Sequence, residues 1–474
     1  MPGRTWHAGP DLACRAGPCR GIFAGQRGRT GSASLVPLNS LLRRLAIDLT
    51  PLRTSRDFRL VFGATGVSGL GSFVTYVTIP YQVYSLTKDP LLVGLLGVCE
   101  LVPLLFMAFV GGALADYLDR RRLVLGGEIG FTVLCGILLV NAMTERPHLW
   151  LLYLVAGLTA ALDGVQRPAL EAITPRVVTP DEIPAAGALS SMRMNIVSLA
   201  GPALAGVLIA TVDLAWVYAL DLATFAVSLT LLGLVRAMPP PAAADRPSLR
   251  SVANGLRYAR SRPELLGTYL VDINAMFFGM PQALYPFLAE RLGGPAVLGL
   301  LYAAPAAGAA LAALTSGWAR HVHRHGLMVL LAAGCWGLAI VGFGLAHALW
   351  LAVLLLALAG AADEISALFR GIIWNQTIPD HLRGRLAGIE MLSYSTGPLL
   401  GQLRSGLSAR WTGVSGAIVS GGVLCVLGTA ALAATLPALV RYDGRDGRAR
   451  KEAEEAAWAA ARASVSAGPR RTPQ

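Results

Sequence analysis

Long, nearly uncharged apolar stretches alternate with short charged links along this chain, from Phe58 to Leu439. A run of about 20 apolar residues lets an α-helix cross a bilayer whose hydrocarbon core is roughly 30 Å thick. Hydrophobic helices buried in a large soluble core are the alternative, but they rarely reach this length in such numbers. We therefore predict twelve membrane-spanning helices, at about 58–86, 91–114, 123–143, 148–173, 186–211, 214–235, 265–289, 296–318, 326–346, 349–373, 386–408 and 413–438.

The two halves of the chain resemble each other. The segment "LTAALDGVQRPALEAITPRVVTPDEIPAAGAL" joins the fourth and fifth predicted spans, and "LAGAADEISALFRGIIWNQTIPDHLRGRLAGI" joins the tenth and eleventh. In this pairing Asp163 matches Asp363, and Gly201-Pro202 matches Gly397-Pro398. Repeated halves with a cavity between them are typical of secondary transporters, in which rocking of the halves gives alternating access. The predicted fold is an all-α integral membrane protein with two pseudo-symmetric six-helix halves.

The same pattern predicts five regions. Residues 1–50 lack the apolar core of a secretory signal, so we expect a disordered or misassigned N-terminal extension there. The N-terminal six-helix half covers 51–236, and the C-terminal half covers 265–440. Between them, residues 237–264 open with a proline run and continue as a basic amphipathic stretch, which predicts a central cytoplasmic loop along the inner leaflet. Residues 441–474 form a charged cytoplasmic tail.

Composition supports the membrane interpretation. The chain is 54% hydrophobic and only 14% charged, with a mean hydropathy of +0.56, whereas a soluble domain carries about 25% charge. The net charge of +12 sits in the links between apolar runs, which favours the positive-inside rule over nucleic-acid binding. Arginines crowd the links that we place inside, such as Arg120–Arg122, so both termini are expected in the cytoplasm of a multi-pass cell-membrane protein.

Several classes of chemistry have no support in the sequence. A primary pump needs a nucleotide site, and the GxxxxGK[ST] loop is absent. The histidines and cysteines lack metal-ligand spacing, so we expect no cofactor, no metal and no structural disulfide. An intramembrane enzyme would need a nucleophile or metal beside its buried acids, and none stands out. The expected partners are a small-molecule substrate, protons and the lipid bilayer, without nucleic acid, for a monomeric protein that is not an enzyme.

The stretch "GGALADYLDRRR" ends the second predicted span. Gly111 and Gly112 allow neighbouring helices to approach closely. Asp116 lies just past the end of the span, where an acid can meet the positive N-terminal end of a neighbouring helix. Arg120 follows one helical turn later. The simpler interpretation is a tight basic loop that holds this turn inside.

The spacing in this stretch resembles the signature loop of the major facilitator superfamily. The matching positions are Gly112, Leu114, Asp116, Arg120 and Arg121, while Tyr117 and Asp119 depart from the usual arginine and glycine. In the fifth span, "SLAGPALAG" is similar to the glycine–proline antiporter motif of exporters in this superfamily, with Gly201, Pro202 and Gly206. Small residues at such positions also serve plain helix packing.

The resemblance extends over about residues 50–440. The segments "RDFRLVF", "LVGLLGVCELVPLLFMAFVGGALAD" and "LGLLYAAPAAGAALAALTSGWA" look like the enterobactin-exporter branch of the superfamily. This resemblance implies a proton-driven exporter of siderophores or other amphipathic small molecules. Relatives in the branch include general drug exporters, so the cargo stays open. A passive facilitator or importer of the same fold is the alternative.

Ionisable side chains inside spans are costly unless they are paired or hydrated, so each is a functional candidate. Glu100 has no basic residue within one turn in sequence, which makes it the first candidate for the proton carrier. The alternative for Glu100 is a structural hydrogen bond to another helix. Asp221 in the sixth span and Asp272 in the seventh are further candidates.

The fourth span carries Asp163, Arg167 and Glu171 on one face, at i, i+4 and i+8. Self-neutralisation by an i,i+4 ion pair is one interpretation. The resemblance suggests another, in which Asp163 pairs with Arg120 as a gate latch. Asp363 with Arg320 or Arg324 would then form the quasi-symmetric latch.

A last group of residues could line a cargo cavity. Arg193 and Asn195 precede the glycine–proline motif, and an intramembrane arginine suits an anionic cargo or neutralises a neighbouring acid. Asn274 is a polar candidate in the seventh span. Tyr76 and Phe277 could stack on an aromatic cargo, although aromatic residues at helical spacing more often pack in a core.

Overall fold

The structure is a computed structural model that describes residues 48–117, 119–237, 257–379 and 382–466. In the first half, the elements are α2 (Thr50–Thr54), α3 (Arg56–Thr87), α4 (Pro90–Tyr117), α5 (Arg120–Met143), α6 (Leu149–Val177), η1 (Pro180–Glu182), α7 (Ile183–Thr211) and α8 (Leu214–Gly233). The predicted extension lies almost entirely outside the described residues, as does most of the central loop.

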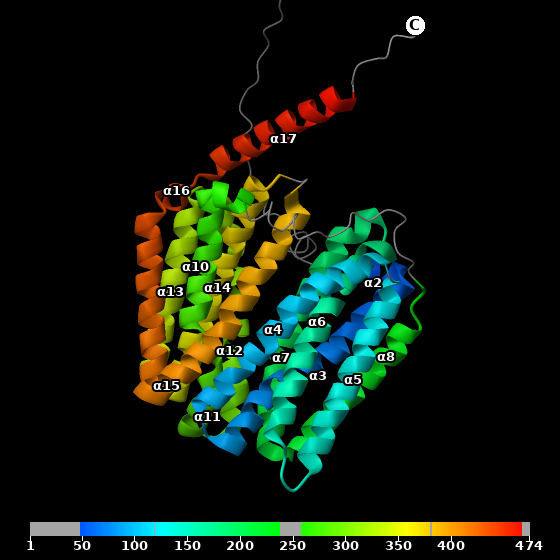
Figure 1. The fold of residues 1–474 in the computed structure, drawn as a ribbon, viewed down its shortest axis with the longest axis vertical. Coiled ribbons are helices and arrows are strands. Elements are labelled where there is room, and N and C mark those ends of the chain that lie inside the picture. The colour runs from blue at the N-terminus through cyan, green and yellow to red at the C-terminus, as the bar shows by residue number, and fades with distance from the viewer. Residues whose placement is uncertain (1–47, 118, 238–256, 380–381, 467–474) are drawn as a thin grey trace, which may run out of the picture. The chain divides into compact units, whose positions relative to one another are not determined.

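The second half has more interruptions. Its elements are α10 (Pro263–Gly279), η2 (Gln282–Leu284), α11 (Tyr285–Leu292), α12 (Pro295–Leu314), η3 (Ser316–His321), α13 (His325–Leu345), α14 (Leu349–Thr377), α15 (Arg383–Thr435), α16 (Pro437–Val440) and α17 (Gly444–Ser466). Helices α2 to α8 gather on one side of Figure 1 and α10 to α16 on the other. The prediction of two helical halves is therefore confirmed.

The count of spans needs two adjustments. Among the described residues, ten helices are long and apolar enough to cross a membrane. Helix α15 contains the last two spans, because Gly413 turns the chain with a left-handed φ of 73°. The seventh span was predicted as continuous but is broken: α10 ends at Gly279, and η2 and α11 follow Pro281. With these two cases, the structure accounts for twelve spans.

Local signals explain several helix ends. Lys88 closes α3 in the left-handed conformation, with its N–H bonded to the Tyr84 carbonyl at 2.8 Å. Asp89 accepts the Leu91 N–H at 2.9 Å and so caps the start of α4. Asp119 caps α5 in the same way, accepting from the Arg121 N–H at 2.9 Å. These hydrogen bonds fix the end of α3 and the starts of α4 and α5.

The two halves meet most closely at the end of the bundle that carries α11, opposite the end that carries α16 and α17 (Figure 1). We call these the α11 end and the α17 end. Helix α7 packs on α12, and α4 packs on α15. A Cβ built on Gly206 would lie 2.6 Å from the Gly299 nitrogen, and one on Gly97 would lie 2.2 Å from the Leu399 carbonyl oxygen. Glycines at these positions thus allow backbone-to-backbone contact between the halves.

Helix α17 continues the predicted tail as an exposed helix. Asp443 accepts the Arg445 N–H at 2.9 Å, and this backbone hydrogen bond lowers the pKa of the Asp443 carboxyl. Further along, Glu454 forms an ion pair with Arg262 and accepts the Tyr258 hydroxyl at 3.1 Å. Lys451 reaches the Asn375 carbonyl of α14 at 3.4 Å. These contacts hold the tail helix against the C-terminal half.

Candidate functional site

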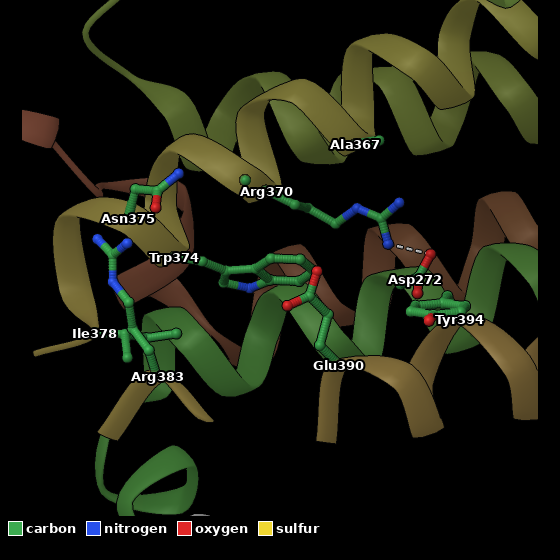
Figure 2. Close-up of a pocket in the computed structure, with 10 residues that line it drawn as sticks. Asp272, Ala367, Arg370, Trp374, Asn375, Ile378, Arg383, Glu390 and Tyr394 are labelled. Atoms are coloured by element: carbon green, nitrogen blue, oxygen red, sulfur yellow. Dashed lines mark ion pairs between the residues drawn. The ribbon is translucent and has the colours of Figure 1, made fainter. Parts of the chain in front are cut away.

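A cavity of about 570 Å³ lies in the C-terminal half, between α10, α14 and α15 (Figure 2). The polar and aromatic side chains among its lining residues are Asp272, Arg370, Trp374, Asn375, Arg383, Glu390 and Tyr394. Asp272 comes from α10, and the others come from the end of α14 and the start of α15, which adjoin the α17 end. The cavity therefore lies away from the glycine contacts that join the halves at the α11 end.

The centre of this cavity is an arginine shared by two carboxylates. Arg370 forms an ion pair with Asp272, and the two side chains are 8% and 5% exposed. Its other terminal nitrogen lies 3.8 Å from Asp363, whose side chain is 39% exposed. Ser393 donates a hydrogen bond of 2.9 Å to the second oxygen of Asp272. This arrangement places two carboxylates around one guanidinium, with net negative charge.

Sequence reasoning placed Asp272 and Asp363 as candidates but missed Arg370. The signal was available, because Arg370 stands inside a predicted span and seven residues, or about two helical turns, after Asp363. The predicted partner Arg320 is exposed in η3. The cation that reaches Asp363 in this conformation is Arg370.

Tyr394 and Arg167 bring the two halves together at the rim of the cavity. The Arg167 guanidinium lies 5.3 Å from the centre of the Tyr394 ring, within the range of a cation–π contact. Arg167 also forms the predicted i,i+4 ion pair with Glu171, at 3.6 Å. Asp163 is exposed on the same helix.

The signature loop is partly described. Gly112 and Asp116 lie in the last turns of α4, and their side-chain surroundings fall outside the described part of the chain. Arg120 donates to the Ala172 carbonyl of α6 at 3.0 Å. Ala172 lies nine residues after Asp163 on the same helix. Arg121 bonds the Leu232 carbonyl at 3.4 Å and also the Gly233 carbonyl. Arg121 thus caps the C-terminus of α8, where a cation is favourable.

Glu100 lies at the junction of the halves. It is within electrostatic reach of the Tyr76 hydroxyl on α3 and the Tyr302 hydroxyl on α12. The two tyrosine rings pack edge to face with centroids 5.9 Å apart, and Tyr76 donates to Gln282 at 2.7 Å. Within the described residues, no basic side chain forms an ion pair with Glu100. This surrounding differs from that of Asp272, which has its own arginine.

The structure distributes the remaining candidates over other contacts. Arg193 bonds the Thr65 hydroxyl and lies 5.5 Å from the centre of the Phe62 ring, so it packs on α3. Asn195 is exposed. Asn274 donates to the Cys425 carbonyl at 3.0 Å and to Thr429 at 3.2 Å, which directs it toward the last span. Phe277 packs against Phe278 at 4.8 Å.

The glycine–proline motif of α7 contributes to helix packing on two sides. A Cβ on Gly201 would lie 2.5 Å from the Phe73 side chain of α3. On the other side, a Cβ on Gly299 of α12 would lie 2.5 Å from the Pro202 carbonyl oxygen. Together with Gly206, this segment lets α7 contact both its own half and the opposite half.

Two further buried acids lie away from the cavity. Asp221 is 1% exposed inside the N-terminal half, where its carboxylate accepts from the Thr75 hydroxyl at 2.5 Å. Glu128 on α5 is 3% exposed, and sequence reasoning missed it although it falls inside the third predicted span. A glutamate between apolar and glycine residues in that span is the signal that could have identified it.

Comparison with known proteins agrees with this architecture. The family model described as transmembrane secretion effector, of the major facilitator superfamily, matches residues 46–466. The enterobactin exporter EntS of Citrobacter koseri is 34% identical over 389 residues, which cover 81% of this chain and 92% of the relative. EntS of Shigella boydii is 33% identical over the same lengths.

Solved structures support the fold. A bacterial homologue of the human lysosomal transporter Spinster, in an inward-facing and unoccupied conformation, aligns with a TM-score of 0.62 at 14% identity and covers 83% of this chain and 97% of its own. The nucleoside transporter NupG aligns with a TM-score of 0.60 at 13% identity, covering 82% and 99%. The chain therefore belongs to the transmembrane secretion effector family of the major facilitator superfamily, as a multi-pass efflux transporter of the inner membrane and not an enzyme.

Proposed function

We propose that this protein exports a small amphipathic molecule, of the siderophore or drug-like class, in exchange for protons. The relatives named enterobactin exporters support this cargo class. The observation that carries the proposal is the cavity of about 570 Å³, with a buried arginine, two aromatic rings and two carboxylates among its lining residues. Such a lining offers polar contacts and stacking surfaces to one molecule at the same time.

The proposed orientation places the α17 end in the cytoplasm. The basic links at Arg120–Arg122 and Arg257–Arg262 belong to this end, which agrees with the positive-inside rule. Tight glycine contacts close the α11 end, so the halves stand in the inward-facing arrangement from which an exporter would load its cargo. Rocking of the halves about these contacts would then open the other side.

Glu100 is the proposed proton carrier. It stands where α3, α4 and α12 meet, so a change in its charge acts directly on the contact between the halves. Asp272 and Asp221 are the alternative coupling acids. The Arg120–Asp163 latch remains part of the proposal for the state that is closed at the cytoplasmic side. A monomer contains all of these elements.

Transport by purified protein in inside-out proteoliposomes tests the proposal. With enterobactin as the probe, an acidic lumen should drive uptake into the vesicles, because protons leave the lumen while cargo enters. A protonophore should abolish this stimulation. Uptake that does not depend on the imposed pH gradient would instead identify a passive facilitator. Cargo that moves in the same direction as the protons would identify an importer.

A further inference from the structure

A polar seam runs through the N-terminal half, where α3, α5 and α8 meet. Its side chains recur every seven residues on α3 and α5, which is about two helical turns and keeps them on one face. On α3 they are Ser68, Thr75 and Gln82, on α5 Arg121, Glu128 and Cys135, and on α8 Tyr218, Asp221 and Ser228. Two of these residues are carboxylic acids.

The first acid, Glu128, is deeply buried and only partly satisfied. Ser68 donates to its Oε1 atom at 3.3 Å. Its Oε2 atom has no hydrogen-bond partner in the part of the chain that the structure describes. Ser228, which is 0% exposed, stands beside the Glu128 carboxyl as a weak donor, although its hydroxyl forms no regular hydrogen bond among the described residues. An acceptor and a neutral donor therefore face each other at this position.

The second acid, Asp221, is enclosed by donors from three helices. Thr75 donates at 2.5 Å and Thr224 at 3.2 Å, and the Cys135 thiol shares its one proton between Asp221 at 3.7 Å and the Tyr218 carbonyl at 3.3 Å. Gly71 of α3 provides the room, because a Cβ there would lie 2.1 Å from the Asp221 Oδ1 atom. The carboxyl is thus held in a fitted site and not in a loose gap.

The charged groups around the seam are engaged elsewhere. On α5, Arg121 bonds the carbonyls of Leu232 and Gly233 at the end of α8. On α7, Arg193 bonds Thr65. The neutral Gln166 of α6 donates to the Val124 carbonyl at 3.1 Å and also faces the Glu128 carboxyl, so it brings no charge to the seam.

The seam also holds two weakly acidic groups. These are the Cys135 thiol and the Tyr218 hydroxyl, which donates to Gln82 at 2.7 Å. No basic side chain forms an ion pair with either carboxyl among the described residues. Two ionised carboxylates inside a membrane without a cation would cost several kcal/mol each.

We infer that Glu128 and Asp221 form a two-carboxyl proton-binding site inside the N-terminal half, separate from the cargo cavity. The donors Ser68 and Thr75 stand about 10 Å apart along α3, so the two carboxyls lie at different levels of the seam. A metal cation binds oxygens within about 2.0–2.6 Å, and it could not use both carboxyls at once. The geometry therefore favours one proton on each carboxyl.

This inference rests on the proposed proton-coupled export, and it adds a route by which protonation could reach the contact between the halves. Thr75 binds Asp221 on one face of α3, and its neighbour Tyr76 donates to Gln282 of the opposite half. A change in charge at Asp221 would shift Thr75 and, through the same turn of α3, Tyr76. Proton binding in the seam can thus act on the interface without contact with cargo.

Infrared difference spectroscopy on the purified full-length protein tests the site directly. The probe is the proton itself, followed through the C=O band of protonated carboxyl groups during a pH titration. Glu128→Gln and Asp221→Asn should each remove one component of the band, and the double variant should remove both. The matched control is Glu145→Gln, which changes an exposed acid and should leave the band intact. A band that is unchanged in the folded double variant would overturn the inference.

The wild-type protein supplies a readout that does not depend on replacing the acids. The Cys135 S–H band, assigned by its loss in Cys135→Ala, should shift over the same pH range as the carboxyl band, because the thiol contacts Asp221. An S–H band that does not respond to pH would contradict the site. If the carboxyl bands titrate but transport does not depend on the pH gradient, the antiport proposal is overturned and the proton-binding site is not. If transport is driven by the pH gradient but the double variant keeps the carboxyl bands, this site is overturned and the antiport proposal is not.

Discussion

The Arg370 guanidinium on α14 is buried against the Asp272 carboxylate on α10, and the same guanidinium lies 3.8 Å from Asp363. One cation therefore serves two acids, of which Asp272 lines the cavity. Under the proposed antiport, cargo and protons would compete with the arginine for these carboxylates. A change in any one of them alters the charge that the other two experience.

Removal of one partner of this buried ion pair should be more harmful than removal of both. Arg370→Met leaves Asp272 buried without its cation, which costs about 3–5 kcal/mol, whereas Arg370→Met with Asp272→Leu removes both charges. We expect the double variant to have a higher melting temperature in detergent than the single variant Arg370→Met. Arg320→Ala, at an exposed position, is the control. Equal melting temperatures for the single and double variants would contradict the pairing.

The glycine contact between α7 and α12 should tolerate no side chain. In Gly206→Val, the new Cβ would lie 2.6 Å from the Gly299 nitrogen, so the halves must separate at the α11 end. We expect transport to fall at least tenfold and cysteines placed near that end to become accessible to water-soluble reagents. Gly136→Ala is the control, because nothing lies within 4 Å of its added Cβ. Normal transport by Gly206→Val would show that the contact is dispensable.

Glu100→Gln should separate proton coupling from cargo movement. Glutamine keeps the size and hydrogen bonding of the side chain but cannot release a proton. We expect export driven by a pH gradient to be lost, while counterflow exchange of cargo for cargo persists. Glu145→Gln should retain both activities. Full gradient dependence in Glu100→Gln would assign the residue a structural role and direct attention to Asp221 and Asp272.

The gate latch predicts a different kinetic signature. Arg120→Ala or Asp163→Ala should reduce flux while cargo binding is largely preserved, since neither residue lines the cavity. Exchange of the two charges should restore part of the activity. Transport and binding assays on the same preparations distinguish these effects. Unchanged flux in both single variants would leave the arginines with a role in topology and in capping of α8 only.

Membrane orientation can be tested independently of transport. Arg262 belongs to the α17 end, which we propose to be cytoplasmic. A reporter enzyme that functions only in the cytoplasm should therefore be active when it is fused after Arg262. A reporter active on the outer face after Arg262 would overturn the proposed orientation. A second fusion within residues 144–148, in the link between α5 and α6, should give the opposite result.

Hydropathy alone was enough to predict the number and approximate limits of the spans, because a membrane-crossing helix needs a long uncharged run. It was not enough to predict the break before Pro281, because hydropathy does not register the helix-breaking tendency of Gly279 and Pro281. The position of Arg370 inside a span, two turns after Asp363, was a local signal, but its ion pair with Asp272 depends on the approach of α14 to α10, which is a tertiary relationship. Asn274 illustrates the opposite case: its polarity was noticed, but its contact with Cys425 is specified only by the folded structure.

The turn at Gly413 has a consequence for how the protein is made. With its φ of 73°, this glycine reverses the chain between two spans with no separate loop, and Arg291 of α11 bonds Ser415 just beyond it at 3.0 Å. A residue with a side chain would lose about 1–3 kcal/mol in this conformation of φ 73° and ψ 169°, which is adopted almost only by glycine. In the proposed orientation, the segment that must cross the bilayer at this turn during synthesis is therefore very short. A link of this length lets the last two spans insert as one helical hairpin.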